Sequence, residues 1–334
     1  MNAEIKTGII FGGIIIAVII FLSILFIGLD ESASINQDSG IKKAPNLVGI
    51  SHYLNISSEE LTKKMDNKVI LYDIWTYSCI NCIRTLSFIT SWDEKYSEQG
   101  LLIIGIHSPE FEFEKDPQNV KIAIEKYGIT YPVVMDNNME TWKAFENNYW
   151  PRKYIADHEG NLRYDHIGEG SYQETEKVIQ QLLDERSIAL GIENISENKL
   201  VTIEEFEHTL FRTPELYFGY KFAQNRNQLG SDEGFQPERI VKYSEPNNIE
   251  LNKFYPIGNW KNHEDSMQLT EAVGSIIVSF DAKEVNIVTK NNAQLEIFLD
   301  GVALTKKYAG SDISFGNKMD VSNAGMYNII NSET

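Results

Sequence analysis

The chain contains only two cysteines, Cys79 and Cys82, and both lie where a predicted strand passes into a predicted helix. Residues 69–75 (VILYDIW) form an apolar run rich in β-formers, and the segment from Cys79 to about Gln99 has a helical pattern that ends at Gly100. Two cysteines exclude a scaffold held by several disulfides and a four-cysteine zinc site. The pair therefore constrains both the fold and the chemistry of this chain.

A cysteine at a helix start is chemically favoured as a thiolate, because unpaired backbone N–H groups and the helix dipole stabilise negative charge there. A thiolate attacks disulfides, and a second thiol one turn further along the helix can resolve the mixed disulfide. We therefore assign Cys79 as the nucleophile and Cys82 as the resolving thiol. A structural disulfide and half of a zinc site are the alternatives. The redox pair is favoured because so small a disulfide loop constrains the unfolded chain little.

The uncharged apolar run from Thr7 to Leu29 is longer than the roughly 20 residues that a helix needs to cross a bilayer. Lys6 precedes the run, and Asp30 and Glu31 follow it, which predicts a cytoplasmic amino terminus with the rest of the chain outside. A cleaved signal peptide is the alternative, with 32–34 as the small-residue cleavage site. Its apolar region would be shorter, at about 7–15 residues.

Alternating strand and helix patterns follow the cysteines. The order from residue 69 is β-α-β-α-β-α-β-β-α, which predicts an α/β domain with parallel strands and an antiparallel edge. Beyond the first strand and helix, the predicted strands cover 101–106, 130–135, 153–156 and 162–166, and the predicted helices cover 117–127, 139–148 and 172–187.

The predicted secondary structure changes from alternating strands and helices to short strands after a polar segment that begins at Gly191. Short strand-like runs at 275–280, 284–289 and 294–299 are separated by turn residues, which predicts a β-sandwich. The predicted division is an anchor at 1–29, a linker at 30–45, an α/β domain at 46–190, a second linker at 191–205 and a sandwich at 206–334.

The charge balance bears on the class of partner. The chain has 48 acidic and 30 basic residues, which gives a net charge of −18. Nucleic-acid binding relies on clustered Lys and Arg, so nucleic acid is not an expected partner. The histidines show no metal-ligand spacing, and no metal is predicted. We expect no cofactor other than a redox-active disulfide between Cys79 and Cys82.

The segment from Leu71 to Thr85 (LYDIWTYSCINCIRT) resembles the active-site segment of the thioredoxin superfamily. The resemblance is closer to the extracytoplasmic TlpA/ResA-type oxidoreductases, and closest to the soluble carboxy-terminal region of DipZ-type cytochrome c biogenesis proteins. It covers roughly 47–187 and implies a thioredoxin-like fold with an inserted helix. Supporting residues lie at 92–96, 107–116, 131–132 and 149–151.

The resemblance implies roles for two residues away from the cysteines. Asp73 occupies the place of a buried carboxyl group that moves a proton to or from the resolving thiol, because burial raises a carboxyl pKa. The alternative is an aspartate at a strand end that is satisfied by the backbone. Pro151 occupies the place of a cis-proline that faces the cysteines, and a plain trans proline at a strand start is its alternative.

Three aromatic residues are expected at the substrate side of the site. Trp75 matches a tryptophan that packs beside the cysteines in this superfamily, although it could also belong to the ordinary core. We expect Tyr77 and Trp150, which lie next to the cysteines and the proline in sequence, to contact the substrate as well.

An acidic loop, 110–116, follows His107 and the second predicted strand. The carboxyl end of that strand is the edge of the sheet where α/β proteins place their sites. Two interpretations are open for this loop and for His107. They could dock a partner protein, or the loop could be an ordinary solvated connection.

The segment 206–304 resembles the domain that follows the thioredoxin unit in DipZ-type proteins. The resemblance implies a jelly-roll β-sandwich similar to carbohydrate-binding modules. Sugar binding is not predicted, because the aromatic side chains Tyr217, Phe218 and Tyr220 are better explained as core or interdomain contacts.

These inferences together predict a membrane-anchored thiol–disulfide oxidoreductase whose catalytic domain faces the extracytoplasmic side. It would exchange disulfides with client proteins, as a reductant in cytochrome c maturation or in disulfide repair. The resemblance implies a CcdA-type membrane thiol transporter as the electron donor. Two alternatives remain, a thiol peroxidase of the redoxin class and a non-catalytic binding protein that acts through the β-sandwich.

Overall fold

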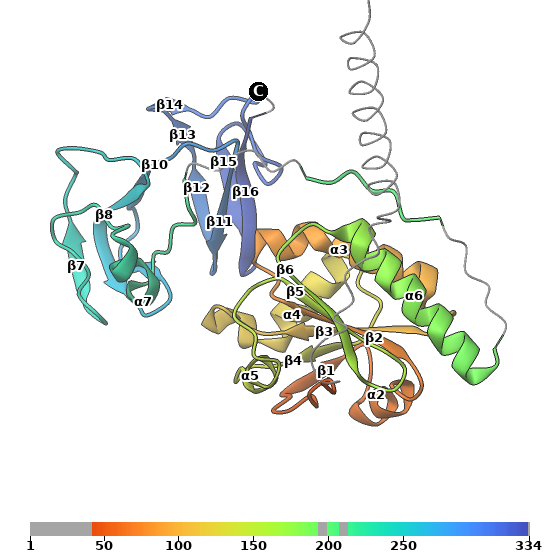
Figure 1. The fold of residues 1–334 in the computed structure, drawn as a ribbon. Coiled ribbons are helices and arrows are strands. Elements are labelled where there is room, and N and C mark those ends of the chain that lie inside the picture. Colours follow the sequence, from red (N-terminus) through yellow and green to blue (C-terminus); the bar gives the residue numbers. More distant parts are fainter. Residues whose placement is uncertain (1–41, 193–198, 207–212, 333–334) are drawn as a thin grey trace, which may run out of the picture.

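The computed structural model describes residues 42–192, 199–206 and 213–332 (Figure 1). The predicted anchor lies outside these residues, as do parts of both predicted linkers. Within the described ranges, no helix combines the length and the apolar character that a membrane span requires.

A six-stranded sheet forms the centre of the first region, with the strand order β1-β4-β3-β2-β5-β6. Neighbours β2, β3 and β4 are parallel, whereas β1, β5 and β6 pair antiparallel. The predicted parallel strands and antiparallel edge are therefore confirmed. The strands are β1 (His52–Leu54), β2 (Val69–Trp75), β3 (Leu101–His107), β4 (Val133–Met135), β5 (Arg152–Ala156) and β6 (Leu162–Ile167).

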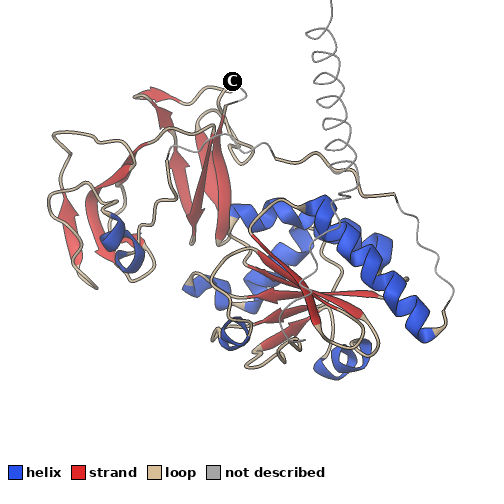
Figure 2. Cartoon of the chain, in the orientation of Figure 1, coloured by secondary structure: helices blue, strands red, loops and turns tan. Residues whose placement is uncertain are grey.

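Helices cover both faces of this sheet, and each face has its own buried apolar cluster (Figure 2). Helices α3, α4 and α6 contribute to the cluster on one face, and α2 and α5 to the cluster on the other. The helices are α2 (Ser58–Lys64), α3 (Ile80–Tyr96), the 3-10 helix η1 (Glu112–Lys115), α4 (Pro117–Lys126), α5 (Glu140–Ala144) and α6 (Tyr172–Leu190).

Two parts of this region differ from the sequence-based expectation. Strand β1 and helix α2 precede the predicted unit and were not predicted. The helix predicted at 139–148 is wrong in extent, because α5 has five residues. Met139 at its start and Glu146 just beyond its end both adopt left-handed backbone angles, which a helix cannot include.

Helices α3 and α6 are joined by a buried hydrogen-bond network as well as by apolar packing. The Tyr96 hydroxyl donates to Glu176 Oε1 at 2.6 Å and accepts a hydrogen bond from Gln180 Nε2 at 2.8 Å. The backbone N–H of Val201, in the predicted second linker, also donates to Glu176 at 2.9 Å. The network therefore fixes the far end of α3 and holds part of that linker against the domain.

We expect Tyr96→Phe to lower the free energy of unfolding by about 2 kcal/mol, because a hydrogen bond to a buried charged group is worth about 1.5–3 kcal/mol. Urea unfolding measures this change. Tyr149→Phe is the matched control, because Tyr149 is 51 % exposed and its change should stay within about 0.5 kcal/mol. Equal losses in the two variants would contradict a role for the network.

The remainder of the described chain is rich in antiparallel sheet. A four-stranded sheet has the order β10-β8-β7 with β9 also on β8, and three two-stranded sheets pair β11 with β16, β12 with β15 and β13 with β14. The elements are α7 (Tyr220–Ala223), the 3-10 helix η2 (Gln224–Arg226), β7 (Ile240–Tyr243), β8 (Lys253–Asn262), β9 (Met267–Leu269), β10 (Ser275–Ser279), β11 (Glu284–Thr289), β12 (Ala293–Glu296), β13 (Phe298–Leu299), β14 (Val302–Ala303), β15 (Lys318–Val321) and β16 (Gly325–Asn331).

The predicted strand at 284–289 coincides with β11, and the one at 294–299 is divided between β12 and β13. Strands β7, β8, β9, β14, β15 and β16 were not predicted.

The sheet-rich region packs beside the first turns of α3 (Figure 1). Arg84 on α3 forms an ion pair with Glu284 on β11 at 3.3 Å. On the loop after β3, the backbone N–H of Glu112 donates to Asp265 Oδ2 at 3.1 Å. The sheet-rich region therefore borders the edge of the first region where the two cysteines lie.

Candidate active site

Cys79 is the N-cap of α3 and has extended backbone angles, with φ −85° and ψ 117°. Its Sγ accepts a hydrogen bond from the backbone N–H of Cys82 at 3.4 Å, the contact expected of a sulfur that caps a helix. Cys82 has no exposed surface, whereas Cys79 is partly exposed, and both thiols are free. Cys79 is therefore the sulfur that an incoming disulfide can reach.

Burial raises the pKa of the Cys82 thiol well above its usual value, and the adjacent Cys79 and Asp73 act in the same direction. At neutral pH the Cys82 sulfur therefore carries its proton. A reaction in which Cys82 acts as a nucleophile needs a group that accepts this proton.

Asp73 lies in the middle of β2, between Gly105 of β3 and Lys153 of β5 in the sheet register. The side chain is fully buried, and neither carboxylate oxygen has a hydrogen-bond partner among the described residues. The alternative of a backbone-satisfied aspartate is therefore wrong. Burial raises the pKa of Asp73 to about 6, although Lys153 opposes the shift. An acid of this kind can exchange protons near neutral pH, and its proton-transfer role stays a prediction.

Lys153 was missed by the sequence analysis. It is fully buried, and its Nζ donates to the backbone oxygen of Gly168 at 3.1 Å. Burial lowers its pKa, while Asp73, Cys82 and Glu169 oppose that change. Nothing in the alternating pattern of a strand distinguishes a buried lysine from an exposed one, so no sequence signal was available.

The peptide bond between Trp150 and Pro151 is cis, as the resemblance implies. Pro151 immediately precedes β5, whose residues pair with β2. Trp150 is partly buried, its Nε1 donates to the backbone oxygen of Ser108 at 2.9 Å, and its ring packs against Trp142 at 4.2 Å between centroids. Its contact with substrate stays a prediction.

Trp75 and Tyr77 are both buried, with exposures of 0 % and 4 %. Trp75 meets the ring of His107 edge-on, with centroids 5.4 Å apart, and Tyr77 stacks on the same ring at 5.6 Å. This packing supports the core alternative for Trp75. Substrate contact by either side chain stays a prediction.

For His107 and Glu114 the structure contradicts both interpretations, whereas Glu112 and Asp116 of the same loop are exposed and both interpretations stay open for them. His107 and Glu114 have no exposed surface, so neither is solvated and neither can dock a partner directly. Burial lowers the pKa of His107 to about 3, so its ring is neutral. The only sequence hint was Phe111 and Phe113, whose apolar side chains alternate with the acidic residues.

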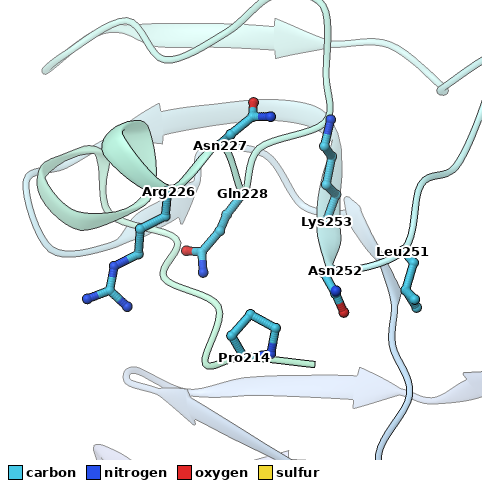
Figure 3. Close-up of a pocket in the computed structure, with 7 residues that line it drawn as sticks. All are labelled: Pro214, Arg226, Asn227, Gln228, Leu251, Asn252 and Lys253. Atoms are coloured by element: carbon cyan, nitrogen blue, oxygen red, sulfur yellow. The ribbon is translucent and has the colours of Figure 1, made fainter. Parts of the chain in front are cut away.

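A hollow of about 300 Å³ lies in the sheet-rich region and contains none of the predicted site residues (Figure 3). Its lining residues are Pro214, Arg226, Asn227, Gln228, Leu251, Asn252 and Lys253. The chemistry of the cysteines is therefore located at the start of α3 and not in this hollow.

Comparisons with known proteins match the α/β region and the sheet-rich region to two different families. Residues 26–183 match the redoxin family, and residues 213–334 match the family described as thioredoxin-like C-terminal domain. Protein DipZ of Mycobacterium tuberculosis is 34% identical over 270 residues, which are 80% of this chain and 38% of DipZ. The chain thus spans well under half the length of this relative.

The thiol-disulfide oxidoreductase YkuV of Bacillus subtilis is 30% identical over 143 residues, which cover 42% of this chain and 94% of YkuV. A solved thioredoxin-like protein in its oxidised form is 28% identical and covers 43% of this chain and 97% of its own, with a TM-score of 0.39.

The strand order, the capped cysteine and the second cysteine one turn later define a thioredoxin-like redox protein. The chain belongs to the family of thioredoxin-like thiol-disulfide oxidoreductases that includes YkuV, and it is similar to DipZ over 80% of its own length. It is therefore an oxidoreductase.

Proposed function

We propose that the protein reduces disulfides in client proteins through Cys79 and Cys82. The observation that carries this proposal is the contrast between a partly exposed Cys79 at the start of α3 and a buried Cys82 one turn later. The Cys79 thiolate attacks one sulfur of the client disulfide. A bond forms between Cys79 and that sulfur, and the other client sulfur leaves as a thiolate that takes a proton from water.

Cys82 completes the reaction. Asp73 accepts the Cys82 proton, and the resulting thiolate attacks Cys79 Sγ and expels the second client sulfur as a thiolate, which takes a proton from water. The products are a client dithiol and a Cys79–Cys82 disulfide, so two electrons pass to the client. The Cys79–Cys82 pair is the only redox group that the proposal requires. The support for Asp73 is its complete burial next to Cys82 and its raised pKa.

The proposal extends to the location of the enzyme and to its partners. Residues 7–29 would anchor a single-pass membrane protein with its catalytic region on the extracytoplasmic side, and a CcdA-type membrane thiol transporter would supply electrons. The reduced client proteins would serve cytochrome c maturation or disulfide repair. The support is the long uncharged run at the amino terminus and the resemblance to DipZ-type proteins. The sheet-rich region is proposed to be a jelly-roll β-sandwich, on the basis of its antiparallel strand pairs.

We expect the anchor to be separable from the catalytic region. Full-length protein expressed in a bacterium should sediment with membranes after an alkaline carbonate wash, whereas residues 30–334 should stay in the supernatant. A protease added to intact spheroplasts should digest the catalytic region of the full-length protein. Protection from that protease would contradict the extracytoplasmic orientation.

We expect the Cys79–Cys82 couple to be reducing, with a potential closer to about −270 mV than to about −120 mV, the two ends of the thioredoxin superfamily. The reason is that the two residues between the cysteines, Ile80 and Asn81, provide no cation to stabilise a thiolate. Equilibration with glutathione at defined ratios, followed by thiol counting, measures the potential. A value near −120 mV would show that the protein oxidises its clients instead.

A further inference from the structure

The loop before Cys79, residues 76–78, is hydrogen-bonded to the buried carboxyl group of Glu114, which the proposed reaction does not use. Oε1 of Glu114 accepts a hydrogen bond from the Ser78 hydroxyl at 2.5 Å. Oε2 accepts hydrogen bonds from the backbone N–H groups of Glu110 and Phe111, at 2.6 and 2.9 Å. Glu114 has no exposed surface, so these contacts are shielded from water. Ser78, the residue next to the nucleophile, is thereby tied to the 3-10 helix η1, 36 positions further along the chain.

Thr76 and Tyr77, which precede Ser78, also contact residues of β3 and of the segment after it. The Thr76 side chain is also a hydrogen-bond partner of Glu114, and its Oγ1 lies 3.3 Å from Nε2 of His107. Tyr77 stacks on the ring of His107. The backbone N–H of Cys79 in turn donates to the backbone oxygen of Thr76 at 3.4 Å. A displacement of residues 76–78 would therefore move Cys79 as well.

The partners named above for the Glu114 carboxyl group are all uncharged donors. Burial raises its pKa, and the hydrogen bonds from Ser78, Thr76, Phe111 and Glu110 act in the opposite direction. A buried carboxyl group is costly unless its oxygens are hydrogen-bonded. Here four donors from two segments converge on one side chain, so its effect is to hold those segments in a single relative position.

The sheet-rich region contacts the outer side of the segment 110–116, which carries Glu114. Asp265 accepts a hydrogen bond from the backbone of Glu112, and Tyr217 is a hydrogen-bond partner of the Glu110 side chain. Nζ of Lys290 lies 5.9 Å from the centre of the Phe113 ring. The segment 110–116 is thus held by the residues before Cys79 on one side and by the sheet-rich region on the other.

We infer that Glu114 is a positioning residue, which holds residues 76–78 so that Cys79 Sγ stays aligned with the backbone N–H groups at the start of α3. The inference rests on the proposed function, because Cys79 is taken as the nucleophile. When residues 76–78 lose their hydrogen bonds to Glu114, Cys79 Sγ loses this alignment, and its thiolate loses part of its stabilisation.

The experiment measures the reactivity of Cys79 in the full chain, in a Cys82→Ser background that leaves one thiol. The rate of alkylation by iodoacetamide is followed against pH. Ser78→Ala removes the link to Glu114 and leaves the carboxyl group in place. We expect the midpoint of the pH profile to move upward by about 0.5–1 unit, which lowers the rate at pH 7 about three- to tenfold.

Glu114→Gln tests whether the link or the charge matters. A glutamine side chain can still hydrogen-bond to Ser78, so we expect a change in rate of less than about twofold. Glu112→Gln removes a carboxylate of the same 3-10 helix whose side chain is 71% exposed, and it should leave the profile unchanged. Thermal unfolding of each variant shows whether the fold is retained.

Two results would overturn the inference. If Ser78→Ala lowers the unfolding temperature but leaves the pH profile of Cys79 unchanged, the contact is merely structural. If Glu114→Gln moves the midpoint to lower pH while Ser78→Ala does not move it, Glu114 acts through its charge and not by positioning. The alkylation assay contains no client, so its result is independent of whether the proposed disulfide reduction occurs.

Discussion

Replacing Cys79 with serine should slow client disulfide reduction by about a thousandfold or more, because loss of an enzyme's nucleophile removes most of its rate enhancement. A serine hydroxyl is not ionised at neutral pH and cannot form the mixed disulfide. Cys79 is also the partly exposed sulfur of the pair, so no other thiol in this chain can take its place. The measurement is the rate of insulin reduction with dithiothreitol as the electron source.

Cys82→Ser is the informative partner variant. It should also lose turnover, but it should retain the first step and accumulate a covalent mixed disulfide with the client, which non-reducing electrophoresis detects. If Cys79→Ser traps the client and Cys82→Ser does not, the two assigned roles are reversed. If Cys79→Ser keeps full turnover, the proposed function is wrong. Rapid consumption of hydroperoxide without a client disulfide would favour the thiol peroxidase alternative.

The second large effect is expected for Asp73→Asn, which should slow release of the client from the mixed disulfide about a hundredfold at pH 7. The raised pKa of Cys82 leaves its proton in place at neutral pH, and the Asp73 carboxylate is the proposed acceptor. In the wild type the rate of release should rise as the pH passes through about 6, where Asp73 ionises. The variant should lack this rise. Stopped-flow measurement of release from a preformed mixed disulfide tests both statements.

The same substitution should change stability in a pH-dependent way. The folded-state pKa of Asp73 is raised from 3.8 to about 6, so folding favours the protonated acid, and stability is lost as the pH rises from 3.8 to about 6. At pH 8 the variant should be more stable than the wild type by at most about 3 kcal/mol, since each pKa unit corresponds to about 1.4 kcal/mol. Below pH 4 the difference should disappear.

Asp66→Asn is the matched control for both measurements, because Asp66 is exposed and precedes the start of β2, whereas the cysteines follow the end of that strand. It should change neither the rate of release nor the pH dependence of stability. A release rate in Asp73→Asn that equals the wild-type rate at all pH values would exclude Asp73 as the proton acceptor. The buried aspartate would then contribute only to the stability of the fold.

Sequence patterns were most informative where local interactions determine structure. The run 69–75 is β2 without a residue of difference, and the predicted helix start at Cys79 is the N-cap of α3. Both predictions rest on short-range rules, a buried strand of continuous apolar residues and a helix that needs a cap. The short α5 shows the limit of such rules, because left-handed backbone at two non-glycine residues is invisible to periodicity.

The site itself combines residues that are far apart in the chain. Cys79 and Cys82 were found from their spacing, and Asp73 and Pro151 from the resemblance. Burial of an individual polar side chain depends on which segments pack over it, and a linear pattern of charges cannot report that. This is why Lys153 and Glu114 were missed, although both lie close to the residues that were found.

By itself, the sequence determined the order of strands and helices from β2 to α6, the place of the reactive cysteines and the family of the protein, because each depends on residues close together in the chain. The tertiary structure alone decided that Asp73 is buried opposite Lys153, that Glu114 lies behind Ser78, and that a sheet-rich region borders the cysteine edge. These features depend on contacts between distant segments. Their energies come from desolvation and from buried hydrogen bonds, which exist only once the chain has folded.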